Sequence, residues 1–396
     1  MKFIKKAQVG VQLNCLNWFL SVGTRSRSHS ARAYKKAQVG VQFNWIFVLI
    51  AGGIILLFFF GLVTKQKEVS EVDLAATIVT DLDSIFTSAK VARDTGAVIQ
   101  VPNNEMQFDC DGYSILGIKR GLDSNIVFAP KSLKGTELIT WSQPFNFPFT
   151  VENFLYITSK DIRYIFVCGN SAACDIAEKV YEEMPDSMTK EICKDTDTDC
   201  VDNLKDENHY KVRIVYFGSN PAYQMAGNLG KADISAVAFE SIVDGGLEVN
   251  YFKKESNKFM LVDMRMRYSI ILANKNKENF ETIYAAIFAE DVELYNCMMK
   301  RAFKRLSIVS EMVKMRGESI FKDTSCEYLS SKSETGFTKL IEVSKICQKT
   351  FPSDETDECS PTKLNGLLGS VFGETTLTTI EGNNVRLQNK GCPLWY

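Results

Sequence analysis

Residues 45–63 read WIFVLIAGGIILLFFFGLV, a run of nineteen residues without a single charge. At a rise of about 1.5 Å per residue, a helix of this length nearly spans a hydrocarbon core of about 30 Å. Buried helices of soluble domains seldom run this far without a polar residue, and glycine is common in membrane helices, so Gly52 and Gly53 fit. The stretch therefore predicts one transmembrane helix.

The charges on either side of this stretch predict its orientation. Residues 1–36 hold eight Lys and Arg and no Asp or Glu, as expected of a cytoplasmic flank. We therefore expect a single-pass protein of the cell membrane, with a cytoplasmic N-terminus and an extracytoplasmic C-terminal part. Subtracting those eight from the 46 Lys and Arg leaves 38 against 48 Asp and Glu, a formal charge near −10 for residues 37–396. This balance argues against a nucleic-acid partner.

The residues just before the anchor carry a short motif. Lys35, Lys36, Ala37 and Gln38 begin the run KKAQVGVQF, which leads directly into the apolar stretch. A basic pair, a small residue, Gln and a hydrophobic stem together resemble the class III signal peptides of archaeal type IV pilins and archaellins. The resemblance implies cleavage between Ala37 and Gln38, with the hydrophobic helix kept on the mature protein. An uncleaved signal anchor is the alternative.

Two positions depart from the family pattern. Gly40 stands where the family usually has Ser, and Gln42 stands where it has Glu. Because that Glu is linked to subunit assembly in the family, filament formation is left open. The octapeptide KKAQVGVQ also occurs at residues 5–12. A local duplication or a misplaced start codon explains this better than a repeat fold, which would need three or more units.

An apolar stripe lies beyond the anchor. Its members alternate at spacings of three and four, and they are Val72, Ala75, Val79, Leu82, Phe86 and Ala89. This spacing predicts an amphipathic helix that continues the anchor to about Ala92, as in the long N-terminal helix of pilins. The stripe can pack on the protein's own head or on a second copy of the chain. The membrane and self-association through Val72–Ala89 are therefore the predicted partners.

The rest of the chain predicts a mixed α/β head, of α+β or α/β class. Ile162–Val167, Ala172–Met184 and Lys211–Phe217 read as strand, helix and strand, which predicts a parallel βαβ unit. Pro144 and Pro148 predict a stiff connection that ends the preceding β-rich unit. The predicted parts are a leader 1–37, an anchor 38–64, an amphipathic helix 65–95, a β-rich unit 96–158, an α/β unit 159–275 and a helical region 276–396.

Cysteines are concentrated beyond the anchor, where ten of the eleven lie. An even number on an exported face predicts disulfides, and we expect at least two. Cys193 with Cys200 and Cys359 with Cys392 are plausible pairs, although connectivity cannot be read from sequence. Buried thiols are the alternative for some positions. Zinc is disfavoured because there is no CxxC pair and only one histidine, His209, beyond the anchor.

An acidic segment offers the one candidate metal site. Oxygen-bearing side chains occupy positions 1, 3, 5, 9 and 12 of a twelve-residue calcium loop, at Asp195, Asp197, Asp199, Asn203 and Asp206. The sixth position is Cys200, where such a loop needs Gly for its sharp turn. An exposed acidic loop closed by Cys193 and Cys200 is therefore the alternative to calcium.

Catalytic motifs are missing from the sequence. There is no GxSxG or HExxH, and the segment from Gly227 to Ala232 lacks both the leading Gly and the hydroxyl of a phosphate-binding loop. We therefore predict a non-enzymatic, membrane-anchored surface protein with a role in envelope structure, adhesion or assembly. The alternative is a ligand-binding ectodomain, of the sensor or solute-capture kind, that uses the region between Phe217 and Ala232.

Overall fold

The computed structural model describes most of the chain in two compact units, Met1–Val69 and Ser70–Tyr396. The described residues are 34–89, 95–101, 104–194, 209–218, 233–241, 246–255, 258–261, 268–271, 280–290, 292–320, 331–350, 359, 361–367, 380–389 and 391–394.

The first unit consists, where it is described, of the beginning of helix α1 (Tyr34–Ala89). Its segment Trp45–Gln66 has a mean hydropathy of 3.0, and none of it is buried. Large side chains such as Phe47 and Leu57 are about three-quarters exposed, at 74% and 75%. Among the described residues, this is the one helix that is long and apolar enough to cross a membrane. The prediction of a single apolar N-terminal helix is confirmed.

The last turns of α1 belong to the second unit and pack against a small antiparallel sheet. This sheet has the order β4-β3-β2-β6, built from β2 (Met106–Phe108), β3 (Gly112–Ile115), β4 (Ile118–Gly121) and β6 (Ser132–Leu133). Val79, Leu82 and Phe86 are buried, and the Phe86 ring meets the Tyr113 ring edge-on at 5.3 Å. The Tyr113 hydroxyl lies 3.2 Å from the Val79 carbonyl and 2.9 Å from Asp83 Oδ1. This outer part of the apolar stripe is therefore covered by the protein's own head.

A second sheet has the order β1-β7-β8-β5. Its strands are β1 (Thr95–Gln100), β5 (Ile126–Phe128), β7 (Glu137–Asn146) and β8 (Thr150–Ser159). Pro144 lies inside β7 and Pro148 lies in the turn to β8, so the predicted connection at the end of the β-rich unit is wrong. Pro144, which has no N–H to donate to a ladder, lies beyond Ser142, where β1 no longer pairs with β7.

The third and largest sheet has the order β10-β9-β11-β12-β13-β14, and β15 pairs with β13. Its parallel strands are β9 (Ile162–Cys168), β10 (Thr189–Lys194), β11 (Lys211–Phe217) and β12 (Asp233–Ser241). The antiparallel strands are β13 (Gly246–Glu255), β14 (Lys258–Leu261) and β15 (Tyr268–Ile271). Helix α2 (Ser171–Glu183) comes after β9, and the Asn170 side chain caps it by accepting from the Ala173 N–H at 2.9 Å.

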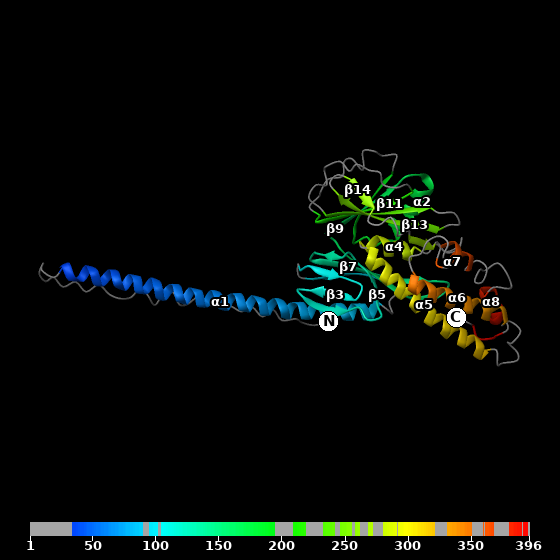
Figure 1. The fold of residues 1–396 in the computed structure, drawn as a ribbon, viewed down its shortest axis with the longest axis horizontal. Helices are drawn as coiled ribbons and strands as arrows, with labels where there is room; N and C mark the ends of the chain where they lie inside the picture. The colour runs from blue at the N-terminus through cyan, green and yellow to red at the C-terminus, as the bar shows by residue number, and fades with distance from the viewer. Residues whose placement is uncertain are drawn as a thin grey trace. The chain divides into compact units, whose positions relative to one another are not determined.

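Helices fill the rest of the second unit. They are α4 (Glu281–Phe288), α5 (Val292–Ile320), α6 (Ser331–Thr350), α7 (Pro361–Leu367) and α8 (Ile380–Asn389). Figure 1 shows α4 between the second and third sheets, where Tyr284 meets Trp141 at 4.6 Å and Phe288 meets Tyr164 at 5.8 Å. Every residue of α4 is buried, so this short helix joins the two sheets through one core. Near the chain end, Leu394 also packs against this core.

Candidate functional site

Two buried cations mark the amino end of strand β11. Lys211 and Arg213 are 4% and 3% exposed, although the strand that carries them, KVRIVYF, is otherwise apolar. Because side chains alternate along a strand, both cations project from the same face. Buried charges require partners, so each of these two residues must find polar groups inside the fold.

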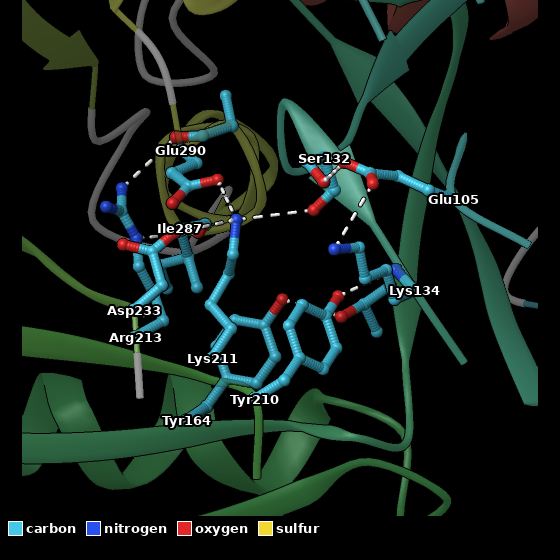
Figure 2. A network of polar contacts seen from close by, with 12 residues as sticks. Glu105, Ser132, Lys134, Tyr164, Tyr210, Lys211, Arg213, Asp233, Ile287 and Glu290 are labelled. Atoms are coloured by element: carbon cyan, nitrogen blue, oxygen red, sulfur yellow. Dashed lines mark hydrogen bonds and ion pairs between the residues drawn. The ribbon is translucent and has the colours of Figure 1, made fainter. Parts of the chain in front are cut away.

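Arg213 binds the carboxyl end of helix α4. Its Nε donates to the Ile287 carbonyl at 3.3 Å, and Nη2 donates to the carbonyls of Ala286 at 3.2 Å and Ala289 at 3.1 Å (Figure 2). The last carbonyls of a helix lack partners within it and carry partial negative charge, so a guanidinium suits this position. Burial lowers the pKa of Arg213, but arginine stays protonated in proteins. The remaining nitrogen, Nη1, is buried and has no hydrogen-bond partner among the described residues.

Lys211 joins three segments that are distant in the sequence. Its Nζ donates to Glu290 Oε2 and to the Ser132 carbonyl at 3.3 Å, and it lies 3.6 Å from Asp233 Oδ2 (Figure 2). Glu290 comes just after α4, and its side chain is only 14% exposed. The ammonium group therefore connects β6, the start of β12 and the connection between α4 and α5.

Two tyrosines and a carboxylate complete the polar surroundings. Tyr164 shares a hydrogen bond of 2.7 Å with Thr158, and the Tyr210 hydroxyl accepts from the Lys134 N–H at 2.8 Å. Burial raises the pKa of both tyrosines, so both stay protonated near neutral pH. Hydrogen bonds from Ser132 and Lys134 lower the pKa of Glu105, which holds it as a carboxylate.

A cleft of about 300 Å³ opens beside this cluster. It is lined by Lys131, Ser132, Lys211, Asp233, Ile234, Ser235, Lys253 and Glu290. Its size is at the lower end of the range for sites that hold one small molecule. Three lysines against two carboxylates leave the lining positive, so the arrangement is suited to holding a negatively charged group. We name it the β11–β12 cleft.

The predicted site residues lie elsewhere. Lys35, Lys36, Ala37 and Gln38 fall in the first two turns of α1. The calcium-loop residues 195–206, with Cys200, lie outside the described residues, as does most of the region between Phe217 and Ala232. In the part of the chain that the structure describes, no three metal-ligating side chains come together.

The prediction of at least two disulfides is confirmed, with a different pairing. The described bonds join Cys110 to Cys297, Cys168 to Cys174 and Cys347 to Cys359. The expected pair of Cys359 with Cys392 is therefore wrong, because Cys359 lies close enough to the end of α6 to bring its Cα within 5.2 Å of the Cα of Cys347. Cys193 and Cys392 are also disulfide-bonded. The pair of Cys193 with Cys200 stays a prediction.

The sequence did not predict the β11–β12 cleft, because the predicted ligand region between Phe217 and Ala232 follows the opposite end of β11. Ligands of open parallel sheets usually bind outside the carboxyl ends of the strands, whereas this cleft lies at their amino ends. One available signal was the pattern Lys-x-Arg at the start of an apolar strand, which places two cations on one buried face.

Comparisons with known proteins give no match for this chain: no protein-family model fits it, and no curated protein and no solved structure is similar to it. The residues and their geometry are therefore the basis for a functional proposal.

Proposed function

We propose that this chain is a membrane-anchored extracytoplasmic protein with a structural, adhesive or assembly role. The observation that carries the proposal is the segment Trp45–Gln66, which is strongly apolar and of which none is buried. An apolar surface of this extent would be costly in water, and a bilayer covers it along its whole length. The basic leader, with no acidic residue before Tyr34, supports a cytoplasmic N-terminus.

The cysteines support an oxidising location for the head. Disulfides persist outside the cytosol, and the described part of the head holds three. The bond from Cys110 to Cys297 joins residues 187 apart in the sequence. Closing so long a loop constrains the unfolded chain strongly, which suits a protein that must stay folded on a cell surface.

A pilin-like export route is consistent with helix α1. The helix begins at Tyr34, contains the KKAQVGVQF run and the apolar segment, and ends at Ala89. In the second unit, Val79, Leu82 and Phe86 of the same helix are buried against the head. These features support the long N-terminal helix that the pilin resemblance implies, whereas cleavage between Ala37 and Gln38 rests on the resemblance alone.

Two experiments test this proposal. N-terminal sequencing of the mature protein should read from Gln38, whereas an intact leader would contradict pilin-type processing. For assembly, a Gly53→Cys variant places a thiol where a Cβ meets no atom within 4 Å. Mild oxidation of membranes should then produce disulfide-linked dimers that the unmodified chain does not form. A variant that stays monomeric would contradict assembly through the anchor.

The β11–β12 cleft favours a second function, that of a ligand-binding ectodomain. Its lining is polar and positive, and Lys211 at its base is held in place by Glu290, Asp233 and the Ser132 carbonyl. A preorganised charge of this kind reduces the cost of ordering side chains when a ligand binds. Binding and structural roles are compatible in one surface protein.

A further inference from the structure

Three side chains that can donate hydrogen bonds lie in a row across neighbouring strands, and two of them, Ser235 and Lys253, line the β11–β12 cleft. Arg213 of β11 is the direct partner of Ser235 of β12, and Ser235 is the direct partner of Lys253 of β13. Adjacent strands lie about 4.8 Å apart, and residues paired in this way project from the same face of a sheet. The three side chains therefore leave the sheet side by side on one face.

Two of these three side chains keep an atom that has no hydrogen-bond partner among the described residues. Arg213 Nη1 and Ser235 Oγ are both buried without a hydrogen-bond partner among the described residues, and Ser235 as a whole is only 4% exposed. Buried polar groups are nearly always hydrogen-bonded in folded proteins, so two neighbouring exceptions need an explanation. The exposed Lys253 has no ion-pair partner within the described part of the chain.

The two carboxylates of the cleft form their ion pairs with Lys211, and neither forms one with Arg213 or Lys253. Glu290 and Asp233 both face Lys211, at the adjacent position of the strand pair. Arg213 donates to the carbonyls at the end of α4 and lies over the ring of Tyr251, and it also feels the charge of Glu290 without forming an ion pair with it. The positive charge of Arg213 and Lys253 is thus left on either side of the Ser235 hydroxyl.

We propose that the β11–β12 cleft is a binding site for a small molecule that carries an oxyanion group, either a carboxylate or a phosphate. Ser235 and Lys253 contact the anion, and Arg213 and Lys211 supply fixed positive charge behind it. Charge-assisted hydrogen bonds to an anion are short and strong, and a cleft of about 300 Å³ admits one small ligand. This inference rests on the ligand-binding candidate and is independent of the membrane anchor.

The test is isothermal titration calorimetry on the full chain in detergent micelles, at constant ionic strength set with chloride. Inorganic phosphate and succinate are titrated separately as probes. Saturable binding of one probe, with the other inert, identifies which oxyanion the site prefers. Saturable binding of both supports a site that accepts either oxyanion. If neither probe binds, the proposal is overturned.

Variants locate the site. Lys253→Gln should weaken binding by about tenfold and Ser235→Ala by about fivefold, since each removes one hydrogen bond to an anion. Lys304→Gln, an equally conservative change at an exposed lysine of α5, should leave the affinity unchanged. Equal affinity in the Lys253 and Lys304 variants would place any binding elsewhere and overturn the proposal. Because Lys253 is exposed, its variant is expected to fold, which circular dichroism checks. Failure of anion binding would leave the membrane-anchored role intact.

Discussion

The apolar segment of α1 and the two buried cations of β11 reverse the usual placement of side chains in opposite ways. Trp45–Gln66 is apolar and none of it is buried, whereas Lys211 and Arg213 are charged and buried. The first needs an environment that the chain does not supply, and we assign it to a bilayer. The second finds most of its partners inside the fold, at the end of α4 and at Glu290. The exposed apolar segment therefore needs a partner outside the chain, whereas the buried cations have most of their partners within the fold.

Breaking the buried cluster should have the largest effect on stability. Glu290→Ala removes the nearest carboxylate from Lys211, which stays buried with only the more distant Asp233. Removing one partner of a buried ion pair costs about 3–5 kcal/mol, so the free energy of unfolding of the head, measured in urea, should fall by this amount. Glu318→Ala is the control, because its pair with Lys314 lies on the surface of α5 and is worth less than about 1 kcal/mol. Equal effects of the two variants would show that the cluster is not a structural centre.

Adding a charge to the apolar segment should weaken its insertion into a membrane. Leu57→Arg places a cation in the middle of Trp45–Gln66, at a cost of about 2.5–3.5 kcal/mol for insertion into a membrane. The fraction of protein that stays in membranes after alkaline extraction should fall. Ile308→Arg, at an exposed apolar position of α5, should not change this fraction. Retention of the Leu57 variant at the original level would count against a membrane helix.

Tyr113→Phe tests how the end of α1 is held on the head. The change removes the hydrogen bonds to the Val79 carbonyl and to Asp83 but keeps the ring against Phe86. We expect a loss of about 1–2 kcal/mol, seen as a lower midpoint in urea unfolding. An unchanged midpoint would show that ring packing alone fixes the helix.

The smallest expected effect is a dependence of stability on alkaline pH. Burial raises the pKa of Tyr164 above the ordinary value of 10.0, so the folded state favours the protonated hydroxyl. The stability that this contributes is complete below the pKa of the unfolded state and is lost as the pH rises above it. Unfolding in urea at about pH 9 and about pH 11 should show this loss. Tyr164→Phe should lose less over the same interval; an equal loss would contradict the assignment.

Periodicity predicted the elements whose partners are local. β9, β11 and α2 lie within a residue or two of their expected bounds, and β9 and β11 are adjacent and parallel as predicted. β10 was missed because TKEICK is a polar edge strand without an apolar run. The predicted helical region 276–396 begins with two helices, α4 and α5, because the chain leaves the helix at Ala289, which places Glu290 beside Lys211.

The cleft could not be predicted in the same way, because its partners are distant. Lys211 contacts Ser132 and Glu290, each 79 residues away in the sequence. Nothing in the local pattern around either residue indicates the other. Only the position of α4 between the second and third sheets brings them together.

The central claim, that the head is held outside the membrane by α1, is tested most directly by thiol labelling on intact cells. Ser319→Cys provides an exposed thiol on α5 of the head. A membrane-impermeant maleimide should label this variant on intact cells, to the same extent as in lysed cells and above the background of the unmodified chain. Labelling that appears only after lysis would place the head in the cytoplasm and contradict the account.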